Sequence, residues 1–196
     1  MSVYRLSTPL READIRRLRL GDVVYLSGHI FTARDMAHLR IRDLLEQGAP
    51  PPRPFKGAAI FHAGPVALKN PDGSWRLNVI GPTTSIRMEP YAEMVGKLGV
   101  RAVIGKGGMD ADTQACCKRF GYVYLQAAPG CAAKLAQGIE RINGVTWPEL
   151  GMPEAMWDLQ AKGFGPLVVG MDTRGDSVYQ QLRAAATERL NAVYPA

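Results

Sequence analysis

Short apolar runs with strand character alternate with helix-like segments through the middle of the chain, and this alternation constrains the fold more than any other feature. Residues 102–104 (Ala-Val-Ile) and 123–125 (Val-Tyr-Leu) are the clearest strands, and a helix is predicted between them from Asp110 to Phe120. Upstream, the turn Asn70–Gly73 joins two extended runs as a hairpin. This order predicts a mixed sheet with helices packed on one side.

The rest of the chain completes one α/β domain over residues 1–196, with no linker or internal repeat. Periodicity and turn residues predict the further elements. In the first half they are a surface helix over 9–19, a buried strand over 23–27, a turn at 28–31, a helix capped by Thr32 that ends before Gly48, a strand over 58–62 and a turn at Gly64-Pro65. In the second half they are a helix from residue 88 to about 98, a helix from Pro129-Gly130 to Asn143-Gly144, a last strand over 167–171 and a closing helix over about 177–194.

The net charge of +6, from 24 Lys and Arg against 18 Asp and Glu, leaves two classes of partner open. A nucleic-acid-binding protein usually shows a clustered basic patch with aromatic residues interleaved. The only dense basic stretch, Arg11 to Arg19, is interrupted by Glu12 and Asp14 and is interpreted as a solvated helix face. Composition alone does not choose between nucleic acid and a small anion, but the interrupted pattern leads us to expect no nucleic-acid partner.

The three cysteines indicate a reducing compartment, and their positions do not suit an iron–sulfur cluster. Cys116, Cys117 and Cys131 are odd in number and two are adjacent, which favours a reducing cytoplasm over a disulfide framework. No run approaches the ~20 apolar residues that a membrane span needs. No His, Cys and carboxylate pattern has metal-ligand spacing, so the chain is expected to hold no metal. An iron–sulfur cluster would have to come from another chain.

Three segments lie where a predicted strand ends and a helix or tight turn begins, and we call them the junctions. They are residues 32–38 (Thr-Ala-Arg-Asp-Met-Ala-His), residues 81–88 (Gly-Pro-Thr-Thr-Ser-Ile-Arg-Met) and residues 105–109 (Gly-Lys-Gly-Gly-Met). Free N–H groups and the helix dipole make such places receptive to anions. If the strands are parallel, Arg34, Arg87 and Lys106 converge at one sheet edge.

The residue types at the junctions suit a dicarboxylate. Arg34 and Arg87 can each bind a carboxylate through two N–H bonds, and Lys106 adds a point charge. Thr83, Thr84 and Ser85 can supply hydroxyls to the substrate. Gly107 and Gly108 would let the backbone approach it closely. His38 follows Arg34 by one helical turn and could therefore reach the same pocket. Each feature also has an ordinary explanation, because Thr-Thr-Ser runs cap helices, isolated arginines lie on surfaces and Gly-Lys-Gly-Gly forms turns.

Together the junctions resemble the signatures of the β subunit of class I, iron–sulfur-dependent hydro-lyases, a family that contains class I fumarate hydratase and L(+)-tartrate dehydratase. Lesser matches are residues 61–65 (Phe-His-Ala-Gly-Pro) and 149–154 (Glu-Leu-Gly-Met-Pro-Glu), so the resemblance runs from about residue 20 to residue 175. It implies a swivelling β/β/α domain that closes over an oxygen-sensitive [4Fe-4S] cluster. The cluster's cysteines are implied to belong to an α subunit, and we expect an (αβ)2 assembly, because closed two-fold assemblies are the commonest kind.

The resemblance also implies roles for individual residues. Thr83 would take the catalytic base position, together with an acidic residue of the α subunit and with Lys106 nearby. Arg34, Arg87 and Lys106 would bind the substrate carboxylates, and His38 is carried over with them. The function implied is reversible hydration of a C4 dicarboxylate, with fumarate/(S)-malate first and L(+)-tartrate second. The alternatives from other classes are a non-catalytic dicarboxylate-binding module and an RNA-binding protein.

Overall fold

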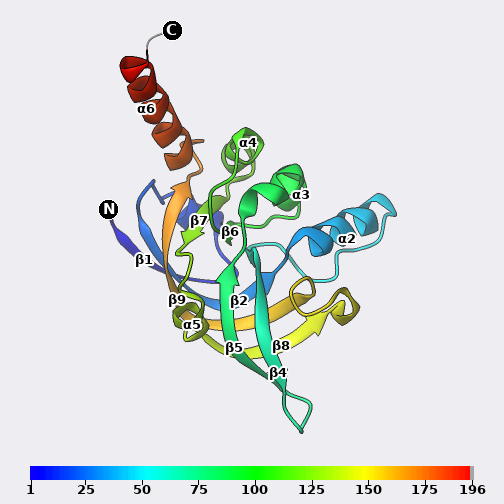
Figure 1. Cartoon of the computed structure of the whole chain (residues 1–196). Helices are drawn as coiled ribbons and strands as arrows, with labels where there is room; N and C mark the ends of the chain where they lie inside the picture. The colour runs from blue at the N-terminus through cyan, green and yellow to red at the C-terminus, as the bar shows by residue number, and fades with distance from the viewer. Residues whose placement is uncertain (195–196) are drawn as a thin grey trace.

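The computed structural model describes residues 1–194 as a mixed sheet whose strand pairings close on themselves (Figure 1). Four parallel strands form its centre: β2 (Val23–Thr32), β3 (Ala59–Phe61), β6 (Ala102–Gly105) and β7 (Val123–Ala127). The long strand β9 (Met156–Met171) runs antiparallel to both β7 and β2 and therefore closes the ring. Outside the ring, β1 (Val3–Ser7) pairs with β2, and β8 (Ile139–Thr146) pairs with β9. The predicted α/β fold with a mixed sheet is confirmed.

Alternation along the central strands produces two hydrophobic cores, one on each face of the sheet. In β6, Ala102 and Ile104 belong to one core and Val103 to the other. In β7, Leu125 and Tyr124 divide in the same way. Because successive side chains of a strand point to opposite faces, these short runs need apolar residues at every position. That requirement explains why they are recognisable in the sequence.

Different elements cover the two faces. Helices α2 (Asp35–Glu46), α3 (Ala92–Lys97) and α4 (Ala111–Phe120) pack on one face through side chains such as Ile41, Val95 and Cys117. The antiparallel hairpin of β4 (Ala63–Lys69) and β5 (Trp75–Pro82) contributes to the other core, as do α1 (Glu12–Ile15) and α5 (Ala132–Ala136). Helices therefore contribute to both cores, and the expectation of helices on one side only is wrong.

Several predicted boundaries are also wrong, and tertiary pairing explains them. Residues 28–31 continue β2 instead of turning, because β9 pairs with them and Gly28, at φ +91°, lies against Thr8. Gly64-Pro65 lies inside β4, a strand of the separate two-stranded sheet, where proline is tolerated. The helix predicted up to residue 144 stops at Ala136, because the following residues pair with β9 as β8.

The cap predicted at Thr32 is wrong as well. The N-cap position of α2 is Arg34, and the Thr32 hydroxyl instead accepts a hydrogen bond from the backbone N–H of Trp157 at 2.9 Å. Asp35 begins the helix, as expected. The surface helix predicted over 9–19 is limited to α1, and a short 3-10 helix, η2, covers Pro148–Leu150.

The predicted closing helix is present as α6 (Val178–Val193), which projects from the sheet away from the β4–β5 hairpin (Figure 1). Its N-cap Ser177 accepts a hydrogen bond from the N–H of Gln180, and none of its residues is buried. Among residues 1–194, no helix is both long enough and apolar enough to cross a membrane.

Candidate active site at the edge of the parallel strands

The second and third junctions lie side by side and are joined through their backbones. The second leaves β5 and enters the 3-10 helix η1 (Ser85–Tyr91), and the third follows β6. The N–H of Ser85 donates to the carbonyl of Lys106 at 3.0 Å, and the N–H of Lys106 donates to the carbonyl of Thr83 at 3.3 Å. The N–H of Thr83 donates to the carbonyl of His62, just after β3, at 2.7 Å. The chain therefore holds Thr83 and Lys106 next to each other.

The first junction reaches the second through an ion pair. Arg87 donates from Nε to Asp35 Oδ1 and from Nη2 to Asp35 Oδ2, both at 2.9 Å. The same Nη2 donates to Thr83 Oγ1 at 3.0 Å. The hydrogen bond from Arg87 holds the pKa of the Asp35 carboxyl below its usual value, and the pKa of Arg87 is raised in turn. The predicted convergence of the three junctions is confirmed, while the catalytic and binding roles of their residues stay predictions.

Arg34 has a carboxylate neighbour from a distant part of the chain. Its Nε lies 3.0 Å from Glu154 Oε1, although no acceptor is aligned with this buried N–H in residues 1–194. The other oxygen of Glu154 accepts a hydrogen bond from the N–H of Met36 at 3.0 Å. The sequence interpretation missed Asp35 and Glu154 as partners of the two arginines. The match at residues 149–154 was a signal for Glu154, and the adjacent charges of Arg34 and Asp35 were a signal for Asp35.

Unlike Arg34 and Arg87, Lys106 has no carboxylate partner, since its side chain forms no ion pair among residues 1–194. Thr84 forms a β-bridge with it and is half-buried. Gly107 is exposed at φ +80°, with only the Thr84 methyl near the place of a Cβ, which leaves room for a ligand. Gly108 is buried, because the ring of Tyr179 lies within 2.7 Å of where its Cβ would be.

A second group of polar side chains lies buried beneath these residues. Ser85 is fully buried; its Oγ accepts a hydrogen bond from the Tyr124 hydroxyl at 3.0 Å and lies 3.0 Å from His62 Nδ1. Burial lowers the pKa of His62 well below 6.5, and the neighbouring His38 lowers it further. Thr84 is therefore more accessible to a substrate than Ser85 in this conformation.

His38 is also fully buried, and it contacts the backbone of Arg34. Its Nδ1 lies 2.9 Å from the carbonyl oxygen of Arg34, and its ring stacks on Tyr91 at 5.3 Å. Burial lowers its pKa to about 4, so the ring is neutral at pH 7. Its Nε2 has no partner within residues 1–194. The predicted contact between His38 and substrate would require this ring to become accessible.

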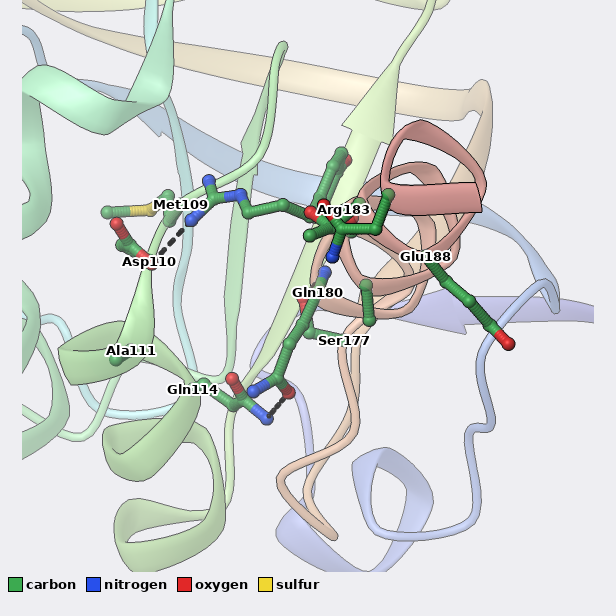
Figure 2. A pocket seen from close by; sticks show the side chains of 12 residues that line it. Met109, Asp110, Ala111, Gln114, Ser177, Gln180, Arg183 and Glu188 are labelled. Atoms are coloured by element: carbon green, nitrogen blue, oxygen red, sulfur yellow. Dashed lines mark hydrogen bonds and ion pairs between the residues drawn. The ribbon is translucent and has the colours of Figure 1, made fainter. Parts of the chain in front are cut away.

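The nearest large cavity, of about 650 Å³, adjoins the third junction (Figure 2). It lies between the start of α4 and α6 and is lined by Met109 and Asp110 rather than by Arg34, Thr83 or Arg87. Arg183 of α6 extends toward Asp110, 3.7 Å away, and Gln114 donates to Gln180 at 2.9 Å (Figure 2). The cavity borders the candidate site without containing its cations.

The residues described hold no ready set of metal ligands. No group of three or more His, Cys, Asp or Glu side chains in residues 1–194 is arranged to bind a metal ion. Cys116 and Cys117 are buried in α4, and burial raises the pKa of the Cys117 thiol well above its usual value. Cys131 is exposed at the start of α5.

Comparison with known proteins identifies the family of the chain. The sequence pattern of the family described as fumarase C-terminus matches residues 2–182. A Methanocaldococcus jannaschii protein, provisionally named L(+)-tartrate dehydratase subunit beta, is 44% identical over 93% of this chain and 94% of its own. The L(+)-tartrate dehydratase subunit beta of Escherichia coli K12 is 41% identical over 96% of this chain and 92% of its own.

A third relative is a longer protein. It comes from Geobacillus stearothermophilus, is provisionally named a class I fumarate hydratase, and is 43% identical over 96% of this chain but only 36% of its own length. These matches confirm the resemblance carried by the three junctions. The chain therefore belongs to the fumarase C-terminus family.

Proposed function

We propose that the chain is the β subunit of a hydro-lyase that reversibly adds water across the double bond of a C4 dicarboxylate. The observation that carries this proposal is the cationic edge formed by Arg34, Arg87 and Lys106 around Thr83, in a chain that matches hydro-lyase relatives over nearly its whole length. Fumarate/(S)-malate and L(+)-tartrate are the two substrates to test. Tartrate gains support because two relatives of similar length carry that name.

The arginines can bind substrate carboxylates without giving up the partners they already have. Arg87 uses Nε and Nη2 for Asp35 and Thr83, so the two N–H groups of Nη1 remain for a ligand. Lys106 contributes a charge that no carboxylate of residues 1–194 neutralises. Arg34, held next to Glu154, would face the second carboxylate. Two carboxylates bridging these cations would fix the double bond between them.

Thr83 is the proposed base, and its neighbours would make its hydroxyl easier to deprotonate. An ordinary hydroxyl is far too weak an acid to lose its proton at neutral pH. The guanidinium of Arg87 donates to Thr83 Oγ1, and this donation would stabilise the negative charge of an alkoxide there. In the dehydration direction that alkoxide would accept the proton from the substrate carbon and become the hydroxyl again. The proposal includes an acidic residue of the α subunit that acts together with Thr83.

The remaining parts of the working enzyme come from a partner. We propose that an α subunit carries a [4Fe-4S] cluster, which would supply a Lewis-acidic iron for the substrate hydroxyl, in an (αβ)2 assembly in the cytoplasm. This chain's own residues bind and orient the dicarboxylate and hold the proton at Thr83. The three free cysteines support a reducing compartment.

The test is reconstitution of the two subunits under anaerobic conditions. The chain is assayed with fumarate, (S)-malate and L(+)-tartrate, first alone and then with the α subunit of the same organism and a reconstituted cluster. We expect no turnover by the isolated chain and turnover of at least one substrate by the complex. Inactivity of a stable complex with an intact cluster on all three substrates would contradict the proposal. Dicarboxylate binding by the chain alone, with such inactivity, would favour a non-catalytic binding module.

Thr83→Ala tests the assignment of the base within the active complex. We expect turnover to fall by about 100-fold or more, as is common when a general base is lost. If turnover stays within about three-fold of wild type, while Arg87→Ala reduces it by the about 100-fold typical of a lost charge-stabilising donor, Thr83 is not the base and only accepts the hydrogen bond from Arg87.

A further inference from the structure

A second cavity lies on a part of the molecule that shares no residue with the three junctions. It has a volume of about 440 Å³ and lies between the end of β1, the last part of β2 and the loop before β3. We call it the distal pocket, and the lining residues that matter are His29, Phe31, Arg53, Pro54, Lys56 and Asp158. Its volume is within the ordinary range for a small-molecule site.

The charges of the distal pocket favour an anion. Neither Arg53 nor Lys56 forms an ion pair with any carboxylate of residues 1–194. Arg53 donates from Nε to the Thr146 hydroxyl at 3.1 Å, and this bond fixes the guanidinium while its other N–H groups have no partner among residues 1–194. Asp158 is the one carboxylate of the lining and is already engaged by two donors. Both donors lie at Oδ1, and the lining therefore carries two cations against one carboxylate.

The ring of His29 is held by that carboxylate. Asp158, only 8% exposed, lies with Oδ1 at 2.9 Å from His29 Nδ1 and accepts a hydrogen bond from the Asn143 amide at 3.0 Å. Because an ionised carboxylate only accepts hydrogen bonds, Nδ1 carries the proton in this pair. The second ring nitrogen, Nε2, is left for another partner, and the side chain of His29 is 56% exposed.

Apart from Thr8, the rest of the wall is apolar. Phe31 and Ala58 are each only 5% exposed, and Pro9 and Pro54 lie on the same cavity. Phe31 is fixed by an edge-to-face contact with Phe55 at 5.8 Å. A flat apolar group can lie against such a wall while a charged group attached to it reaches Arg53 and Lys56.

We infer that the distal pocket binds a small organic anion, namely a carboxylate or phosphate attached to a flat apolar group. Arg53 and Lys56 bind the charge, His29 supplies a hydrogen bond through Nε2, and the Phe31 wall takes the apolar part. This site is independent of the proposed hydro-lyase activity, because none of its residues belongs to the cationic edge.

The test uses benzoate as the probe and the full-length chain. NMR signals of the His29 ring are followed during titration and assigned with a His29→Asn variant, which is straightforward because the chain has only three histidines. We expect a saturable shift of these signals. Benzyl alcohol, which keeps the ring without the charge, and inorganic phosphate, which keeps a charge without the ring, should each bind about ten-fold more weakly. Phenyl phosphate in place of benzoate distinguishes the two anionic groups.

Variants decide whether the binding occurs at this place. Arg53→Gln and Lys56→Gln should each weaken benzoate binding by about ten-fold, as expected for a lost charge-assisted contact. Lys56 is exposed, so its variant is expected to fold even if Arg53→Gln does not. The matched control is Arg76→Gln, which removes one exposed positive charge from β5 and should leave the affinity unchanged.

Two results would overturn the inference. The first is a His29 signal that does not move, or an affinity that is the same in wild type, Arg53→Gln and Lys56→Gln. The second is binding that disappears in Arg87→Gln and persists in both distal-pocket variants, because benzoate would then occupy the cationic edge. Neither result would bear on the reconstitution test of the hydro-lyase.

Discussion

Two layers of polar side chains lie one beneath the other at the edge of the parallel strands, and they differ in how deeply their residues are buried. The outer layer, which is partly exposed, consists of Arg34, Asp35, Thr83, Arg87 and Lys106. The inner layer, which is buried, consists of His38, His62, Ser85 and Tyr124. Both layers draw on the first two junctions, so neighbouring residues such as Thr83 and Ser85 have opposite surroundings.

The difference teaches that one motif can serve two purposes. In the outer layer, Arg87 and Asp35 are about 40% exposed, at 41% and 38%, so their ion pair contributes little to stability and mainly orients the guanidinium. In the inner layer, hydrogen bonds such as that between Tyr124 and Ser85 satisfy buried groups, whose loss is costly. Substitutions in the outer layer should therefore change activity and spare stability, and those in the inner layer should do the reverse.

The largest effect is expected for Arg87→Ala in the assembled enzyme. The change removes both a carboxylate-binding group and the donor to Thr83, so kcat/KM should fall by about 100- to 1,000-fold, as for lost oxyanion-type donors. The free energy of unfolding should change by less than about 1 kcal/mol, because the pair is exposed. Steady-state kinetics and urea unfolding measure the two quantities, with Arg76→Ala as the matched control. A large loss of stability with little loss of activity would reverse the assignment of the outer layer.

The inner layer should show its largest effect at Gly105, the last residue of β6. A Cβ there would lie 1.8 Å from Ser85 Oγ, and Ser85 is held between His62 and Tyr124. Gly105→Ala should therefore destabilise the fold by about 3 kcal/mol, the upper part of the usual range for overpacking. Urea unfolding of Gly105→Ala, Ser85→Ala and the double variant measures the coupling. Additive losses would show that the two residues do not share the same space.

The sequence predicted which segments meet at this edge but not how deep their residues lie. Periodicity located the central strands, and the rule that parallel strands end at one edge places the first and third junctions, which follow β2 and β6, at the same edge. The second junction follows β5 of the separate hairpin, and hydrogen bonds to Lys106 and Asp35 join it to the other two. Depth was not predictable, because it depends on Tyr124 from β7 and on the position of His62, both far from Ser85 in the chain. Local patterns carry no information about such contacts.

The errors in secondary structure have the same origin. The strand β8 was predicted as part of a helix, and β2 was predicted to turn at Gly28. Gly28 does have the positive φ that is typical of glycine in turns, although it lies within the strand. Both segments pair with β9, and pairing along this long strand outweighed their local preferences. The partners of the arginines were missed for a similar reason, since Glu154 is 120 residues from Arg34 in the numbering.

The pH dependence of stability should show that the histidines of the inner layer are buried. Burial holds the pKa of His38 at about 4 in the folded protein, against about 6.5 in the unfolded chain. Between these values the unfolded chain binds a proton that the folded protein does not, so stability falls as pH drops from about 6.5 toward 4. The loss for one such histidine is about 2 kcal/mol at pH 5, and His62 acts in the same direction.

Urea unfolding at pH 7.5 and at pH 5 measures this loss. The wild-type protein should lose more stability on acidification than His38→Gln, whatever the stability of the variant at pH 7.5. Equal losses in the two proteins would show that His38 becomes protonated in the folded state and is therefore not part of a dry inner layer.

The smallest of these effects is expected for Asp35→Asn, which tests whether the outer layer works through orientation. Asparagine has one acceptor oxygen in place of two, so it cannot hold both Nε and Nη2 of Arg87. The expected result is a fall in kcat of about ten-fold, near the value of one charge-assisted hydrogen bond, with partial recovery in Asp35→Glu. Because Asp35 would act through Arg87, adding Asp35→Asn to Arg87→Ala should cause little further loss. A full additional ten-fold loss in the double variant would mean that Asp35 acts on the substrate directly, and the outer layer would then contain a carboxylate with a role of its own.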